Sequence, residues 1–200
     1  MGKKIEWAGG KGKGMLVRRS RSCYTFLMRI CFFSDIHGVP ETLELFLKRA
    51  AELEAERLVF LGDALYHGPR NGVPVRYDPV ATAKLLNAHK EKIVAVRGNC
   101  DSEVDQMMLD FPIMADYAQL MIGGQLFFLT HGHRWNASHL PPLPTGAILV
   151  HGHTHIPENR PLENGLKLFN PGSISLPKGG SVRSFGLYDG KRLEVLPLES

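Results

Sequence analysis

Cysteine is scarce in this sequence. Its 200 residues contain three cysteines, Cys23, Cys31 and Cys100, which are odd in number and widely spaced. This usage excludes a disulfide framework and a paired-cysteine zinc site. We therefore expect a reducing environment and a cytoplasmic protein.

Long hydrophobic runs are also missing. No apolar stretch approaches the ~20 residues that a membrane-spanning helix needs. The apolar piece at residues 23–27 is short, Arg29 interrupts its continuation, and no small-residue cleavage site follows, which excludes a typical signal peptide. We expect a soluble protein that does not bind membranes.

Most of the chain carries no net positive charge. Residues 1–29 hold eight Lys or Arg against one Glu, which leaves 16 Lys or Arg and 19 Asp or Glu in residues 30–200. A slightly acidic body without clustered Arg and aromatic residues gives little support for a nucleic-acid groove. Nucleic acid is therefore not an expected partner.

The basic charge lies in residues 1–27, which are glycine-rich, lack apolar periodicity and predict a disordered N-terminal extension. This extension could be a basic arm for nucleic acid or a segment upstream of a translation start at Met15 or Met28. The second interpretation is favoured, because a few basic residues in such a tail are usually only solvated. Hydrophobic residues make up 44% of the chain, and we expect residues 28–200 to form one domain.

Within this domain, apolar periodicity predicts helices early and strands late. The expected helices are 40–55, 79–90 and 102–109, and the expected strands are 29–34, 57–61, 93–96, 118–122, 125–130, 147–150 and 166–169, with a final hairpin at Asp189–Gly190. This order indicates an α/β (α+β) layered sandwich with mixed sheets. Residues 64–77, rich in Gly and Pro, predict a long loop of the kind that is often functional.

Five of the hydrophobic stretches run directly into side chains that can bind metal. These side chains are Asp35, His37, Asp63, Asn99, His131, His153 and His155. Ligands bind beyond the carboxyl ends of strands in open α/β sheets. In extended chain, residues two apart project to the same side, so Asp35 pairs with His37 and His153 with His155. The pattern predicts one pocket at adjacent strand ends.

The donor atoms of these side chains limit which metal ions the site can bind. Carboxylate and amide oxygens with imidazole nitrogens, and no thiolate, suit Mn, Fe, Co, Ni or Zn and disfavour a structural zinc site or a calcium cage. Seven ligands are too many for one ion. Two divalent transition-metal ions sharing a bridging Asp fit the count, with manganese as the first choice.

The order of these motifs resembles the calcineurin-like metallophosphoesterases, and among them the bacterial YfcE-type phosphodiesterase family, over residues 29–196. The motifs are Phe33–Gly38, Leu61–Asp63, His67–Asn71, Val96–Met107, Leu129–His133, Gly152–His155 and Asn170–Ser173. The resemblance implies a four-layer αββα sandwich with two mixed sheets. It also implies one metal held by Asp35, His37, Asp63 and His155, and a second held by Asp63, Asn99, His131 and His153.

The implied activity is that of a phosphoric diester hydrolase, in which a hydroxide bridging the two metals attacks a small-molecule phosphodiester. Arg70, in the loop after Asp63, is a candidate for holding a phosphate oxygen because guanidinium geometry matches phosphate. Asn71 beside it is a second candidate. A solvated loop charge remains the alternative for Arg70, and Arg97 is expected to serve in packing.

Cys100 departs from the family pattern, because many relatives carry at this position a His that protonates the leaving oxygen. A thiol with a pKa near ~8.5 is a poorer acid toward an alkoxide, which predicts a preference for aryl or otherwise activated diesters. His133 or His67 could supply the proton instead, and Asp101 could orient a neighbour. A redox or nucleophilic role for Cys100 lacks an adjacent base.

Three other interpretations remain open. The enzyme could be a phosphomonoesterase or a nucleotide or dinucleotide-polyphosphate hydrolase, although its length leaves little room for a substrate-selecting cap domain. The chain could also be a non-catalytic scaffold on the same fold, as the retromer subunit of this superfamily illustrates. A scaffold need not keep all seven candidate ligands. A homo-oligomer is compatible with the sequence.

Overall fold

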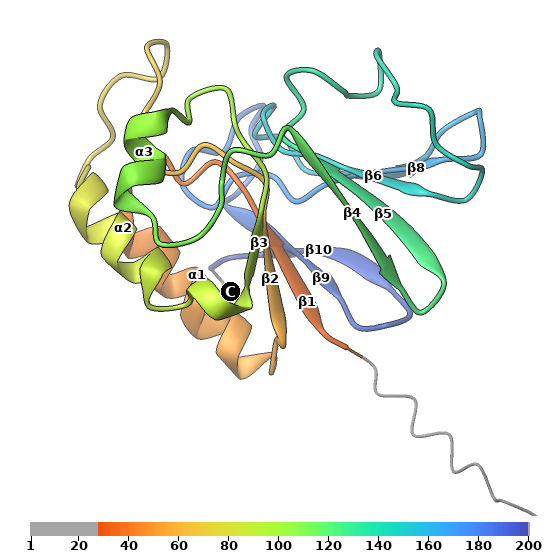
Figure 1. Ribbon diagram of the computed structural model, residues 1–200, viewed down its shortest axis with the longest axis horizontal. Coiled ribbons are helices and arrows are strands. Elements are labelled where there is room, and N and C mark those ends of the chain that lie inside the picture. Colours follow the sequence, from red (N-terminus) through yellow and green to blue (C-terminus); the bar gives the residue numbers. More distant parts are fainter. Residues whose placement is uncertain (1–27, 200) are drawn as a thin grey trace, which may run out of the picture.

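Two mixed β-sheets face each other in the computed structural model, which describes residues 28–199 (Figure 1). The predicted N-terminal extension, residues 1–27, lies outside the described residues. No helix in the described part of the chain is long and apolar enough to cross a membrane. The α/β class with two mixed sheets is confirmed.

The first sheet has the order β10-β9-β1-β2-β3. Its strands are β1 (Ile30–Phe33), β2 (Arg57–Phe60), β3 (Ile93–Ala95), β9 (Ser184–Tyr188) and β10 (Leu193–Pro197). β1, β2 and β3 run parallel, and the final hairpin joins antiparallel to β1 through β9. The carboxyl ends of the three parallel strands therefore lie at one edge of the sheet.

The second sheet has the order β4-β5-β6-β8-β7. Its strands are β4 (Tyr117–Ile122), β5 (Gln125–Thr130), β6 (Ile148–Val150), β7 (Glu158–Pro161) and β8 (Lys167–Asn170). β5, β6 and β8 are parallel, and β4 and β7 are antiparallel edge strands. The polar strand β7 was not predicted from the sequence, because most of its residues are exposed and it has no alternating apolar face.

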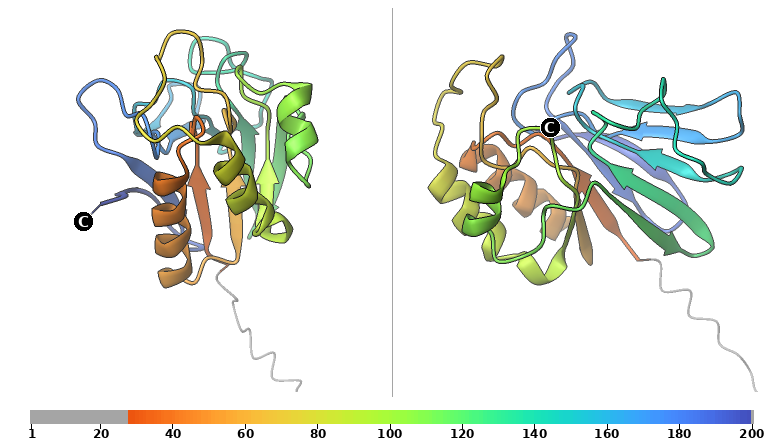
Figure 2. Two further views of the ribbon diagram at one scale, coloured as in Figure 1. Left: turned by 90° about the vertical axis from the view of Figure 1, so that its left-hand side faces the viewer. Right: turned by 45° about the horizontal axis from the view of Figure 1, so that its top comes forward.

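The α-helices α1 (Pro40–Glu52), α2 (Pro79–Asn87) and α3 (Glu103–Met108) lie on the outer side of the first sheet (Figures 1 and 2). Proline in the first turn of α1 and α2 agrees with the expected starts. In α1 an apolar stripe that includes Leu43, Phe46 and Ala50 is buried. α2 ends earlier than predicted and is followed by the short 3-10 helix η1 (Lys90–Lys92).

Successive side chains of β1 point to opposite faces of the first sheet, so they pack into two separate parts of the core. Phe33 faces the helices and stacks on Phe46, with ring centroids 4.4 Å apart. Phe32 faces the second sheet and packs against Phe127 and Phe169, each with a centroid separation of 5.9 Å. Full burial of one such side chain stabilises the fold by roughly 1.5–3 kcal/mol. The two sheets are therefore held in a fixed relative position.

The family resemblance implied a fourth layer of helices on the outer face of the second sheet, but irregular chain covers this face instead. Phe128, Leu149 and Leu168 on this face pack against partly buried side chains that include Trp135 and Leu143. The chain that covers them, residues 131–147, contains no helix. Its three prolines, at positions 141, 142 and 144, lack backbone donors and disfavour helix.

Candidate metal centre

The predicted ligands follow the strand ends in an uncommon backbone conformation. Among the described residues, seven that are not glycine have a positive φ, and five of these seven are predicted ligands. They are Asp35 (58°), His37 (52°), Asp63 (61°), His153 (68°) and His155 (60°). Left-handed backbone at a non-glycine residue costs of order 1–3 kcal/mol and gathers at functional sites. The fold thus tolerates strain where these side chains converge.

Two motif glycines allow this close approach. A Cβ atom at Gly98 would collide with the backbone nitrogen and carboxylate of Asp63, and a Cβ at Gly152 would collide with Ser34 Oγ. Any larger residue at these positions would push the loops apart. Steric exclusion therefore explains why glycine precedes Asn99 in one motif and His153 in the other.

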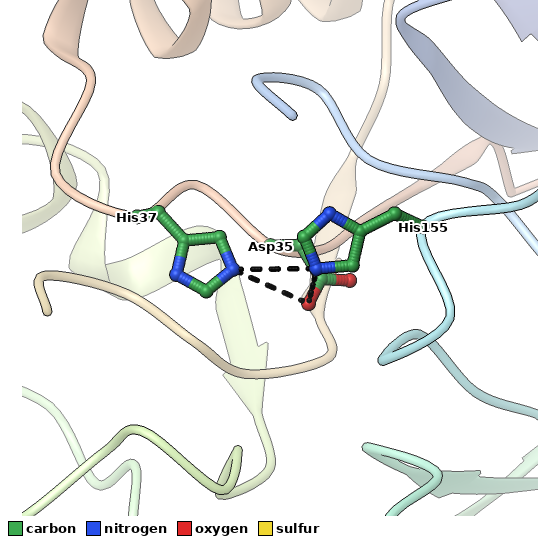
Figure 3. A group of neighbouring side chains, drawn as sticks. All are labelled: Asp35, His37 and His155. Carbon is green, nitrogen blue, oxygen red and sulfur yellow. Dashed lines mark hydrogen bonds and ion pairs between the residues drawn. The ribbon is translucent and has the colours of Figure 1, made fainter. Parts of the chain in front are cut away.

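The first cluster joins Asp35, His37 and His155 (Figure 3). Asp35 Oδ1 lies 3.3 Å from His155 Nε2 and 3.8 Å from His37 Nε2. The two imidazole Nε2 atoms are 3.4 Å apart, and the rings are stacked. All three side chains are buried, and their three potential ligand atoms lie within reach of one ion.

The second cluster forms around His131. Its Nε2 atom lies 3.4 Å from Asp63 Oδ2, 3.0 Å from Asn99 Oδ1 and 3.3 Å from His153 Nδ1. Asp63 also faces the first cluster, since its Oδ2 is 3.7 Å from His37 Nε2. The structure therefore brings all seven predicted ligands together, with Asp63 between the two groups.

Backbone carbonyls orient three of the imidazoles. The Nδ1–H of His37 donates to the Tyr66 carbonyl at 2.9 Å, and that of His131 donates to the Leu61 carbonyl at 2.7 Å. His155 donates in the same way to the carbonyl of Leu176. A carbonyl can only accept, so Nδ1 carries a proton in each of these rings and Nε2 points into the site. In the neutral ring Nε2 is bare, as in metal-binding histidines.

This donor set fits a cation. Asp35 Oδ1 is buried and has no hydrogen-bond donor in the described part of the chain, although imidazole nitrogens surround it. Bare nitrogens and carboxylate oxygens at these distances repel unless a proton or a metal lies between them. Burial opposes protonation of His131, but the hydrogen bond and charge of Asp63 outweigh it and raise the pKa of His131 to about 9.

Asp101 holds the turn that carries Asp63. Its carboxylate accepts the backbone N–H groups of Asp63 (2.9 Å), Ala64 (2.8 Å) and Gly98 (2.7 Å). Burial, together with the charge of Asp63, raises the pKa of Asp101 to about 6. Asp101 thus has the orienting position that the sequence suggested.

The Asn170–Ser173 turn supports the two loops that carry Asp35 and His153. The Asn170 amide donates to the Gly152 carbonyl at 2.9 Å and to Thr154 Oγ1 at 3.0 Å. Ser173 Oγ donates to the Asp35 carbonyl at 2.9 Å. In the described part of the chain no hydrogen bond of the Asn170 or Ser173 side chain goes to a ligand side chain, so this motif supports the loops and adds no donor to the site.

A cleft of about 410 Å³ opens beside the clusters. It is lined by Asp63, Tyr66, Gly68, Pro69, Arg70, Asn71, Arg97, Asn99, Cys100, Asp101, Ser102, His153, His155 and Lys178. The predicted substrate residues Arg70 and Asn71 are therefore at the cleft, whereas His133 is not among its lining residues and packs beside His131 and His153. The sequence did not single out Tyr66 or Lys178, which carry no motif signal.

Cys100 lies where the cleft meets the second cluster. Its backbone N–H donates to Asp63 Oδ1 at 2.8 Å, and the Asn99 amide lies 3.2 Å from its Sγ. Burial and the neighbouring Asp63 carboxylate raise the pKa of the thiol to about 12. Without a cation nearby the thiol is therefore neutral, which agrees with a weak acid and not with a reactive thiolate.

Comparison with known proteins agrees with this geometry. The model of the calcineurin-like phosphoesterase superfamily domain matches residues 28–192. The chain is 48% identical over 174 residues to phosphodiesterase YfcE of Escherichia coli strain K12. The aligned region covers 86% of this chain and 93% of that protein. A solved structure of E. coli YfcE, described as a phosphoesterase, superposes with a TM-score of 0.84 and 46% identity, covering 86% of this chain and 94% of that one.

A more distant relative is the probable metallophosphoesterase YsnB of Bacillus subtilis, which is 26% identical over 169 residues, covering 80% of the chain and 83% of that protein. The match of the family model spans every strand-end motif described above. Members of this family use divalent metal ions, and the clustered donors provide candidate ligands for them. By fold, by motif and by sequence identity, the chain belongs to the calcineurin-like phosphoesterase superfamily.

Proposed function

We propose that this protein is a metal-dependent phosphodiesterase that hydrolyses small-molecule phosphodiesters. The observation that carries the proposal is the convergence of seven oxygen and nitrogen donors around Asp63, beside an open cleft. The similarity to a protein named phosphodiesterase YfcE supports the reaction class.

Two divalent ions, with manganese as the first choice, would share the donor set. Asp35, His37 and His155 would hold one ion, Asn99, His131 and His153 the other, and Asp63 would contact both. When bound, such ions lower the pKa of a water molecule and polarise the phosphoryl oxygens for in-line displacement. The carbonyl-oriented imidazoles and the Asp101 clamp keep the donors in place before substrate arrives.

Arg70 and Lys178 supply positive charge to the same cleft. Neither side chain forms an ion pair with a carboxylate within residues 28–199, whereas other arginines such as Arg134 and Arg183 do. Both are exposed and free to meet the anionic phosphate. The Asn71 amide already donates a hydrogen bond to the His67 carbonyl at 2.9 Å, so this side chain holds the loop in shape and has fewer donors left for a phosphate.

Cys100 limits the leaving groups that the enzyme can release. A neutral thiol transfers a proton poorly to a strongly basic alkoxide, so aryl and other activated diesters are the preferred substrates. His133 is half-buried and lies outside the cleft-lining set, which does not favour it as the acid.

The proposal is tested with metal-stripped protein that is reloaded separately with Mn, Fe, Co, Ni, Zn and Mg. We expect hydrolysis of bis(4-nitrophenyl) phosphate only with metal, best with Mn, and more slowly of 4-nitrophenyl phosphate. Asp63→Asn should lower the rate at least roughly 100-fold, because the loss of metal-ion stabilisation is worth several kcal/mol. Asp110→Asn, an exposed carboxylate outside the cleft-lining set, is the matched control.

Each alternative has its own outcome. Faster hydrolysis of the monoester would identify a phosphomonoesterase, and hydrolysis restricted to nucleotides or dinucleotide polyphosphates would identify that class instead. No hydrolysis with any metal would favour the non-catalytic scaffold. Full activity of Asp63→Asn would contradict the bridging role of Asp63.

A further inference from the structure

Tyr66 is the one carbocyclic aromatic side chain among the residues that line the cleft in the described part of the chain. It remains 41% exposed, while most of the other lining residues are charged or polar. A large aromatic ring left at the mouth of a polar cleft presents a flat apolar surface that a ligand can cover. The proposed hydrolytic mechanism leaves this ring without a role.

The position of Tyr66 is tied to the metal centre. Its carbonyl accepts the Nδ1–H of His37 at 2.9 Å, so the backbone that carries the ring is held one hydrogen bond from a predicted ligand. The ring also contacts the His67 ring, with centroids 4.8 Å apart, and His67 packs edge-on against Tyr77 at 5.3 Å. This row of rings supports Tyr66 from one side.

We propose that Tyr66 is a specificity-determining residue that binds a flat aromatic ester group of the phosphodiester substrate. The inference rests on the proposed function and names its substrate class: diesters in which an aromatic ring lies close to the phosphorus. An aromatic group packed on Tyr66 leaves the phosphate beside Asp63 and the cations Arg70 and Lys178, which line the same cleft.

The test uses phosphonates, whose carbon–phosphorus bond resists hydrolysis. Phenylphosphonate and methylphosphonate are titrated into the full chain loaded with Mn²⁺, and binding is measured by calorimetry. We expect the wild-type protein to bind phenylphosphonate roughly 2- to 10-fold more tightly, the usual worth of an aromatic pair. Tyr66→Ala should remove this preference and leave the affinity for methylphosphonate unchanged, and Tyr66→Phe should retain the preference because the ring remains.

A matched control is Val73→Ala, which removes a 68% exposed apolar side chain from the same loop but outside the cleft-lining set. This variant should keep the phenyl preference. Equal affinities of the wild-type protein for the two phosphonates, or an unchanged preference in Tyr66→Ala, would overturn the inference. Because binding is measured without turnover, a failure to hydrolyse bis(4-nitrophenyl) phosphate would count against the proposed function alone.

Discussion

The carboxylate of Asp101 accepts the backbone N–H of Asp63 at 2.9 Å. The same Oδ2 atom accepts the N–H of Gly98 at 2.7 Å, and Oδ1 accepts the N–H of Ala64 at 2.8 Å. One buried side chain therefore fixes two loops that follow neighbouring strands, β2 and β3. The position of the central carboxylate of the metal centre depends on this clamp.

Asp101→Asn should weaken metal binding without unfolding the protein. An amide has one accepting oxygen, so its NH2 group would face at least one backbone N–H in either orientation. Loss of such a supporting contact typically lowers metal affinity roughly 10- to 100-fold. Calorimetric titration with Mn²⁺ measures the change, and Glu103→Gln, an exposed neighbour, is the control. Unchanged affinity in Asp101→Asn would show that the clamp is dispensable.

Metal binding should release a proton from His131. In the metal-free protein the pKa of this residue is about 9, so the ring is charged at pH 7.5, whereas a metal ligand must be neutral. The apparent metal affinity should therefore fall as the pH is lowered below about 9. Titration in two buffers that differ in ionisation enthalpy measures the released proton. Equal observed heats in the two buffers would contradict the prediction.

The same pKa sets a stability prediction for the metal-free protein. The folded pKa of His131 lies above its ordinary value of 6.5, so its charge stabilises the fold fully below about pH 6.5. This contribution is lost as the pH rises through about 9. Denaturant unfolding with a chelator present, followed from pH 6.5 to 9.5, should show the loss. His131→Asn should show a smaller loss over this range.

The sequence was sufficient to predict the convergence of the seven donors, because strand ends and ligand-type side chains coincide at five places. It could not predict that Asp35, Asp63 and His153 have left-handed backbones, since that conformation follows from the packing of neighbouring loops. Tyr66 and Lys178 were missed for a similar reason. They reach the cleft through irregular loops whose path depends on tertiary contacts, such as the hydrogen bond from Lys178 N to the His155 carbonyl at 3.2 Å.

Among the elements of the fold, those with clear apolar periodicity were predicted well. The strand β7 has an exposed, polar sequence and exists through its backbone pairing with β8. The outer layer over Phe128 was expected to be helical from the family resemblance, but prolines at 141, 142 and 144 keep the covering chain irregular. Backbone pairing with a neighbouring strand and local proline content therefore determine the structure of the segments that apolar periodicity does not predict.

Cys100→His should broaden the range of leaving groups. An imidazole at this position transfers a proton to a basic oxygen far better than a thiol with a pKa of about 12. The rate ratio of diphenyl phosphate to bis(4-nitrophenyl) phosphate should rise, toward the roughly 100- to 10,000-fold that a positioned general acid contributes. Cys100→Ser, which has similar size and no comparable acid, should show no rise. Equal ratios in all three proteins would remove Cys100 from the control of leaving-group chemistry.

Gly98→Ala should damage the metal centre through contact alone. Gly98 has no positive φ, so alanine suits its backbone, but the added Cβ would collide with the backbone nitrogen and carboxylate of Asp63. Overpacking of this kind costs typically 1–3 kcal/mol of stability, and the displaced carboxylate should also weaken Mn²⁺ binding.

Gly72→Ala is the informative control: Gly72 has φ 67° and open space around its Cβ position, so the substitution adds backbone strain without a collision. Denaturant unfolding should show destabilisation in both variants, whereas Mn²⁺ titration should show weaker binding in Gly98→Ala only. Equal loss of metal affinity in the two variants would mean that general loosening of the loops, and not the contact with Asp63, controls the site.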